Sequence, residues 1–116
     1  MQSVWLQNYK KLNEIEAFLN ERLKNAGVTV TIKQLHVLMS LYEQDGQHPS
    51  ALANSVGLPA TSFTPILDGI ESIGLIGRIA DNKDRRSVIV CLTSRGAELR
   101  GKVRRIWDET ETKFKA

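Results

Sequence analysis

Apolar side chains recur every three or four residues in the first part of the chain, the spacing that aligns them on one helical face. In residues 1–26 the apolar stripe consists of Trp5, Tyr9, Leu12, Ile15, Leu19 and Leu23. A second helix is predicted after Thr31, which can form a capping box with Gln34. Its apolar stripe consists of Ile32, Leu35, Leu38, Met39 and Tyr42. The pattern therefore predicts two amphipathic helices, separated by a turn at Gly27.

Two further helices are predicted close together in the middle of the chain. Ser50 can cap a short helix over 51–56, and a tight turn with glycine and proline separates it from a helix over 60–73. The apolar side of the longer helix consists of Phe63, Ile66, Leu67, Ile70 and Ile73. Pro65 suits the first turn of a helix, where no amide donor is needed, so we expect this helix to begin near Ser62.

The hydrophobic period changes after Gly74. Two short strands are predicted over 75–80 and 87–92, joined by a polar hairpin tip over 81–86. Thr93 can then cap a final helix. The apolar positions of that helix are Leu99, Val103, Ile106, Trp107 and Phe114.

The order of these elements predicts a mainly α fold with a small β-hairpin. A tight helix pair followed by a two-stranded hairpin is the winged form of the helix-turn-helix. We expect one domain over 1–116, in which the winged helix-turn-helix occupies 31–92. Helices over 1–26 and 93–116 flank it and are expected to form a dimer.

The composition narrows the functional classes. The 116 residues are 41% hydrophobic and 25% charged, as in a globular domain. No apolar run reaches the roughly 18 residues of a membrane span, and the start has no secretory signal, so we expect a cytoplasmic protein without a membrane partner. With one cysteine, Cys91, and only His36 and His48 besides, no disulfide, metal site or cofactor is expected. No nucleophile–base spacing or glycine-rich phosphate loop points to an enzyme.

The charge distribution is uneven. The formal net charge is +3, and residues 93–116 carry seven basic and four acidic groups. Residues 34–77 contain no lysine or arginine but four acids. Any interpretation as a nucleic-acid-binding protein must accommodate this gap.

Three strings in the sequence resemble those of the MarR-type winged-helix transcription regulators. They are Thr31-x-x-Gln34-x-x-Val37-Leu38, Ala51-x-x-x-x-Val56-x-Leu58-x-x-x-Ser62-x-Thr64, and a wing string with Gly74-Leu75-Ile76-x-Arg78, Asp81-x-Lys83-Asp84-Arg85-Arg86-Ser87 and Leu92-Thr93-x-x-Gly96. The wing string is the most specific of the three. The resemblance covers nearly the whole chain and implies a dimeric DNA-binding regulator on a pseudo-palindromic operator.

The sequence departs from the family pattern in two places. Pro65 stands where the family often has an arginine. Members also usually continue into two long helices after the wing, whereas 24 residues follow from Thr93 to Ala116. We therefore expect the dimerisation region at the C-terminal end to be truncated.

The resemblance assigns the helix after the tight turn to the DNA major groove. Its candidate contacts are Thr61, Ser62, Thr64 and Pro65, with the proline ring placed against a thymine methyl group. Without a guanidinium on this helix we expect modest sequence discrimination. The alternative is that these hydroxyl groups only cap and solvate the helix.

The wing supplies the cations. The resemblance places an arginine of the tip, Arg85 or Arg86, in the minor groove beside Lys83. Asp81 or Asp84 is expected to pair with one arginine and to hold the shape of the loop. The alternative is a solvated charged turn. For Arg78, at the base of the wing, a phosphate contact and a pairing with an acid are left open.

The terminal helices carry the candidate dimer contacts Trp5, Tyr9, Leu12, Trp107 and Phe114, although they could instead fold back over the core of the same chain. The resemblance also implies a small apolar or phenolic effector. No ligand is assigned, because the side chains that would line its site are expected to be ordinary core: Trp5, Tyr9, Leu38, Tyr42 and Phe63. Cys91 is expected to be a buried structural thiol.

A second interpretation is a protein-interaction module on the same scaffold that has lost operator recognition. The absence of lysine and arginine over 34–77 motivates it.

Overall fold

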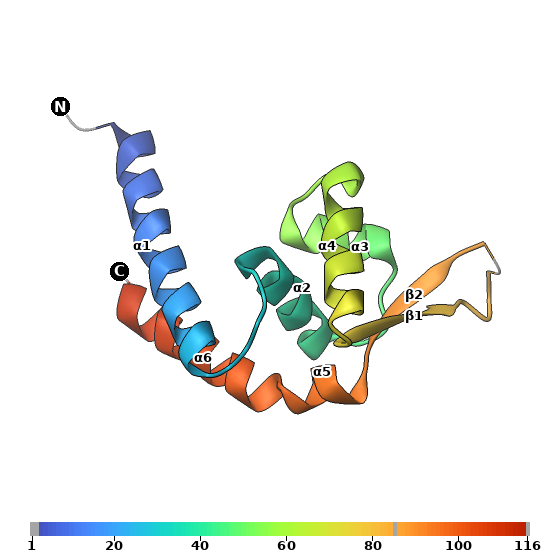
Figure 1. Cartoon of the computed structure of the whole chain (residues 1–116). Coiled ribbons are helices and arrows are strands. Elements are labelled where there is room, and N and C mark those ends of the chain that lie inside the picture. Colours follow the sequence, from blue (N-terminus) through green and yellow to red (C-terminus); the bar gives the residue numbers. More distant parts are fainter. Residues whose placement is uncertain (1–2, 85, 116) are drawn as a thin grey trace.

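The computed structural model describes residues 3–84 and 86–115. The elements in chain order are α1 (Val4–Asn25), α2 (Ile32–Glu43), α3 (Pro49–Val56), α4 (Ala60–Ser72), β1 (Ile76–Ala80), β2 (Val88–Leu92), α5 (Ser94–Glu98) and α6 (Arg100–Phe114). The molecule is elongated, with principal extents of 55 × 30 × 21 Å. The hairpin projects at one end, and α1 and α6 lie together at the other (Figure 1). The predicted mainly α fold with a β-hairpin is confirmed.

Helix α2 is the centre of the hydrophobic core. Six of its twelve residues are buried, and it contacts α1, α3, α4, α6 and β2. The side chains that meet it from these elements include Leu23, Leu52, Phe63, Ile70, Val90 and Val103. Each such apolar side chain stabilises the fold by roughly 1.5–3 kcal/mol relative to an exposed one. The helix pair α3–α4 and the hairpin are therefore held against one common support.

Two predicted helix caps are confirmed. Thr31 Oγ1 accepts a hydrogen bond from the Gln34 amide at 3.2 Å, and Gln34 Oε1 accepts one from the Thr31 amide at 3.0 Å. Thr93 Oγ1 accepts from the Gly96 amide at 3.1 Å. The helix after Thr93 was predicted as one unit but is divided at Leu99 into α5 and α6.

Two predicted helix starts are wrong, and proline is the reason in both. Helix α3 begins at Pro49, not after a Ser50 cap, because a proline fits the first helical position. Helix α4 begins at Ala60 rather than near Ser62, and Pro65 lies inside it. The amides of Ser62 and Phe63 already donate to Pro59 O, at 3.0 and 3.1 Å, so the first turn closes before Pro65 is reached.

The hairpin is antiparallel, and it is extended by Gln47, in a segment that the sequence predicts to be a loop. Its register runs from Ile76 opposite Leu92 to Ala80 opposite Val88, so each strand is one residue shorter than predicted. Gln47 forms an isolated bridge to Val90 on the outer edge of β2, with backbone hydrogen bonds of 3.1 and 2.8 Å. The edge of β2 is therefore partly paired.

The start of α5 fits tightly against the strand entry. A Cβ atom on Gly96 would lie 2.1 Å from the carbonyl oxygen of Leu75, so only glycine fits there without movement. The buried hydroxyl of Tyr42 donates to Gly96 O at 2.7 Å, and Arg100 donates to Tyr42 O. Burial raises the pKa of Tyr42, while the Arg100 charge opposes this. The C-terminal end of α2 is thus joined to α5 and α6 by polar contacts as well as by core packing.

The terminal helices pack on each other but do not fold fully over the core. Phe114 of α6 packs edge-on against Phe18 of α1, with 5.7 Å between ring centroids. In contrast, Trp5, Tyr9 and Leu12 are 70%, 51% and 53% exposed. The expectation of ordinary core is therefore confirmed for Leu38, Tyr42 and Phe63 and wrong for Trp5 and Tyr9. Over residues 3–84 and 86–115, no helix has the length and apolarity needed to cross a membrane.

Candidate nucleic-acid interface

The turn between α3 and α4 directs the start of α4 outwards. Gly57 ends α3 in the left-handed region, at φ +73°, which glycine adopts without steric cost. The Leu58 amide donates to Ala53 O at 3.0 Å, and the Gly57 amide donates to Asn54 O at 3.2 Å. These bonds satisfy carbonyl groups at the end of α3. Because Leu58 packs against the core, the orientation of α4 relative to α3 is set by backbone and core together.

Helix α4 has two chemically different faces. Phe63, Leu67 and Ile70 are buried. The residues of α4 that are predicted to contact DNA are all exposed: Thr61, Ser62, Thr64 and Pro65. The helical period accounts for this division, because burial of one apolar stripe leaves the positions between its members outside. The outward face is polar and uncharged near its N-terminal end.

Two aspartates shape the tip of the wing through backbone bonds. Asp81 Oδ1 accepts from the Lys83 amide at 2.9 Å, and Asp84 Oδ1 accepts from the Arg86 amide at 3.0 Å. Asp84 Oδ2 also accepts from the Ser87 hydroxyl at 3.1 Å. These turns leave the side chains of Lys83 and Arg86 exposed.

The predicted pairing of an aspartate with a wing arginine takes another form. Arg85 lies outside the described residues. Within the described part of the chain, the ion pair of Asp81 is with His48, at 3.4 Å, and Asp84 bonds to backbone and to a hydroxyl. Both aspartates hold the shape of the loop, as predicted, but not through the side chain of an arginine that the structure describes.

The segment before α3 supports the wing from the side. The His48 ring donates from Nδ1 to Val88 O at 3.1 Å while its Nε2 faces Asp81. Asp45 Oδ1 accepts from the Leu92 amide at 2.9 Å. Sequence reasoning missed these contacts, because they join residues 40 and 47 positions apart and no motif marks them.

Arg78 pairs with acids rather than pointing freely outwards. Its Nη2 atom lies 2.7 Å from Asp68 Oδ1, and its Nε lies 3.8 Å from Glu71 Oε1. The arginine side chain is 29% exposed. Of the two alternatives left open by the sequence, the structure shows the acid pairing. Arg78 thereby joins β1 to α4 and neutralises the carboxylates that α4 carries.

Cys91 on β2 is half-buried. Burial raises the pKa of its thiol, and the nearby Asp45 carboxylate raises it further. The thiolate is the nucleophile in alkylation, so we expect iodoacetamide at pH 8 to modify Cys91 more slowly in the folded chain than in urea, by about tenfold for each unit of pKa increase. Time-resolved mass spectrometry measures both rates, and equal rates would contradict the raised pKa of this thiol. The prediction that Cys91 is buried is wrong, because the structure leaves its side chain partly exposed.

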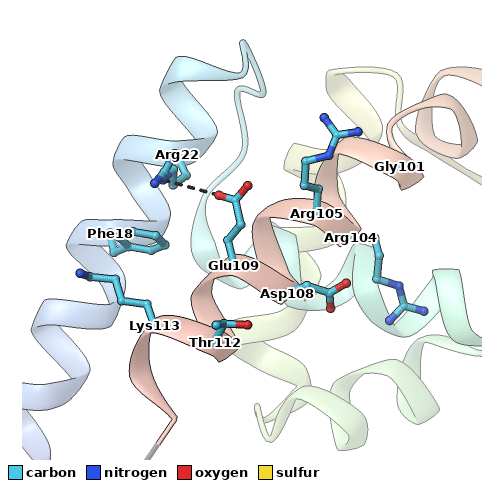
Figure 2. A pocket seen from close by; sticks show the side chains of 9 residues that line it. All are labelled: Phe18, Arg22, Gly101, Arg104, Arg105, Asp108, Glu109, Thr112 and Lys113. Atoms are coloured by element: carbon cyan, nitrogen blue, oxygen red, sulfur yellow. Dashed lines mark ion pairs between the residues drawn. The ribbon is translucent and has the colours of Figure 1, made fainter.

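Several cavities lie away from the wing, and two of them border α1 and α6. A groove of about 760 Å³ runs between α1 and α6, where Arg22 lies over the ring of Phe18 and 3.7 Å from Glu109 (Figure 2). A smaller cavity of about 290 Å³ lies between α1, α2 and α6 beside His36 and Trp107. Burial lowers the pKa of His36, and the nearby Glu16 carboxylate opposes this shift. Among residues 3–84 and 86–115, no group of side chains is arranged to hold a metal ion.

Comparison with known proteins identifies the family. A sequence profile described as the MarR family matches residues 30–88, just over half of the chain. The HTH-type transcriptional regulator TtmR of Methylorubrum extorquens is 32% identical over 74 residues, which cover 64% of this chain and 38% of that protein. The organic hydroperoxide resistance transcriptional regulator of Bacillus subtilis is 32% identical over 75 residues, which cover 65% of this chain and 51% of that protein. The chain thus spans only 38% and 51% of the length of these two relatives.

The solved structures agree on the fold. A cysteine-to-serine mutant of MarR from Escherichia coli, in complex with operator DNA, matches with a TM-score of 0.85 at 22% identity, over 96% of this chain and 79% of that chain. A MarR transcriptional regulator from Methanosarcina mazei Go1 matches with a TM-score of 0.83 at 22% identity, over 97% of this chain and 81% of that chain. Helix order, hairpin and sequence profile lead to one conclusion: the chain belongs to the MarR family.

Proposed function

We propose that the protein is a transcription regulator that binds double-stranded DNA, with α4 in the major groove and the wing tip in the adjacent minor groove. One observation carries the proposal: an exposed, uncharged hydroxyl face on α4 and an exposed cationic wing tip are held on the same core. Cations supply most of the sequence-independent affinity for DNA, and a helix in the major groove reaches the base edges. The likeness to a neighbour bound to operator DNA supports this assignment.

The protein acts as a homodimer on a pseudo-palindromic operator. Support comes from the N-terminal half of α1, where Trp5 stacks on Tyr9 at 5.2 Å and both are more than half exposed. An exposed apolar surface of this kind is typical of an interface. Trp107 and Phe114, the other predicted dimer contacts, are half-buried within the chain and border this end of the molecule. Two-fold symmetry would place the two copies of α4 about one DNA turn apart.

The remaining assignments follow from the family resemblance. A small apolar or phenolic effector suits the 290 Å³ cavity, whose walls include Leu12, Ile15 and Trp107. The protein functions in the cytoplasm and is not an enzyme; its curated relatives are named as transcriptional regulators.

The decisive experiment is binding to duplex DNA at several salt concentrations. Fluorescence anisotropy with a pool of random 30-base-pair duplexes should give measurable affinity at 50 mM salt. The logarithm of the affinity should fall linearly with the logarithm of salt concentration, because bound cations release counterions. Absence of binding at 50 mM salt would overturn the proposal.

The second candidate, a protein-interaction module, has one observation in its favour. The part of the chain that includes α4 carries no lysine or arginine, and Asp68 and Glu71 lie exposed on α4 itself. Such a module would show no retention of the duplex pool, so the same experiment separates the two functions.

The pairing of Arg78 yields a prediction about this interface. Arg78→Gln should weaken DNA binding about five- to tenfold at 0.1 M salt, because Asp68 and Glu71 would then face the phosphates unneutralised. The effect should nearly vanish when Asp68→Asn and Glu71→Gln are already present. Anisotropy titrations of the four combinations provide the measurement. An undiminished loss in the acid-free background would instead indicate that Arg78 contacts a phosphate.

A further inference from the structure

The outward face of α4 lacks the side chains that read purines through paired hydrogen bonds. Residues 60–72 contain no arginine, lysine, asparagine or glutamine. Arginine and lysine bind the guanine O6 and N7 acceptors, whereas asparagine and glutamine bind adenine through N6 and N7. If α4 occupies the major groove, it must therefore recognise bases by other chemistry.

Thr64 and Pro65 make the exposed middle of this face largely apolar. The Thr64 hydroxyl donates to Ala60 O at 3.2 Å, so its proton is used within the helix. Pro65 is exposed and presents a hydrocarbon ring. The apolar group that DNA offers in the major groove is the C5-methyl group of thymine.

Pro65 also changes the hydrogen-bonding chemistry of the helix backbone. In an α-helix, the carbonyl group of residue 61 accepts from the amide of residue 65, and a proline has no such amide. The Thr61 carbonyl group therefore lacks the amide donor that residue 65 supplies in a regular helix, and the proline ring lies against it instead.

We propose that Pro65 is a specificity-determining residue through which α4 selects A·T base pairs. The ring contacts a thymine methyl group in the major groove. This assignment rests on the proposed function, and it adds the class of operator: half-sites whose major groove carries thymine methyl groups at the positions facing α4. The acids of α4 do not oppose this contact, because Arg78 holds Asp68 at 2.7 Å.

The test uses DNA that differs only in the methyl groups. Duplexes enriched by the wild-type chain from a random pool are amplified with either dTTP or dUTP, and the affinity for each pool is measured by anisotropy. Each methyl group buried in the complex should contribute about three- to fourfold in affinity. The wild-type chain should therefore bind the thymine pool at least about threefold more tightly than the uracil pool.

Pro65→Ser removes the ring and restores the amide that occupies the Thr61 carbonyl group. The variant should fold, because a proline inside a helix is unfavourable and serine is not. Its preference for thymine over uracil should fall to about one. Pro49→Ser, at the first position of α3, is the matched control and should keep the wild-type preference.

The outcomes separate this inference from the proposed function. Equal binding of both pools by the wild-type chain would overturn the role of Pro65 and leave DNA binding intact. A preference that persists in Pro65→Ser would overturn it as well, since the methyl groups would be sensed elsewhere. Failure to bind either pool at 50 mM salt would remove both proposals.

Discussion

Gly96→Ala is expected to lower the free energy of unfolding by about 3 kcal/mol, roughly a hundredfold in the unfolding equilibrium. The added Cβ would lie 2.1 Å from Leu75 O and 3.3 Å from Leu92 Cδ2, and the first of these neighbours is backbone that cannot rotate away. Separation of α5 from the strand entry would also strain the hydrogen bond from Tyr42 to Gly96 O. Urea titration followed by tryptophan fluorescence measures the change.

Gly101→Ala is the matched control for this prediction. Gly101 is exposed on α6, and a Cβ there would meet nothing within 4 Å. The control should be stabilised by up to about 1 kcal/mol, because alanine is the better helix former. Similar stability of the two variants would show that α5 does not approach Leu75 as closely as described.

Removal of the two described cations of the wing tip is expected to give the largest effect on DNA binding. Lys83→Ala with Arg86→Ala should reduce the slope of log affinity against log salt by about 2, since each phosphate contact contributes about 0.9. At 0.1 M salt this corresponds to a loss of roughly tenfold for each contact. The loop should keep its shape, because Asp81 and Asp84 bond the backbone amides of these two residues and not their side chains.

The control for charge alone is Lys24→Ala with Lys115→Ala. Both lysines are exposed, with Lys24 in the last turn of α1 and Lys115 at the C-cap of α6. These two helices lie at the other end of the molecule from the hairpin (Figure 1), and loss of the two lysines changes the net charge by the same amount. Anisotropy at four salt concentrations compares the three proteins. If the control loses as much slope as the wing variant, the DNA contact is a general effect of net charge and not a property of the wing.

The helices and the hairpin could be predicted from the sequence because local signals mark them. The period of apolar residues outlines each helix, and the caps at Thr31 and Thr93 use side chains within three residues of the amides they bond. The errors arose where two local signals compete. Pro49 occupies the first helical position beside a serine that could cap, and Pro65 lies inside α4 after a first turn that the Ser62 and Phe63 amides have already closed on Pro59 O.

The candidate site was predictable only in part. The exposure of Thr61 and Thr64 follows from the burial of the apolar stripe of α4. The residues on the exposed face of this helix could therefore be predicted from the sequence alone. The partners of Arg78, His48 and Asp45 depend on how distant segments meet in three dimensions, and the two alternatives for Arg78 could be separated only by geometry.

The short β-bridge between Gln47 and Val90 ties β2 of the hairpin to the segment that follows α2. The amide side chain of Gln47 also donates to Ser40 O and Gln44 O at the end of α2, at 3.0 and 2.7 Å. The connector after α2 is therefore bonded at once to the helix behind it and to the ribbon beside it. A displacement of the last turn of α2 by about an angstrom would therefore tilt the hairpin. Because the hairpin is long and held near its base, the resulting movement would be larger at the wing tip than at Val90.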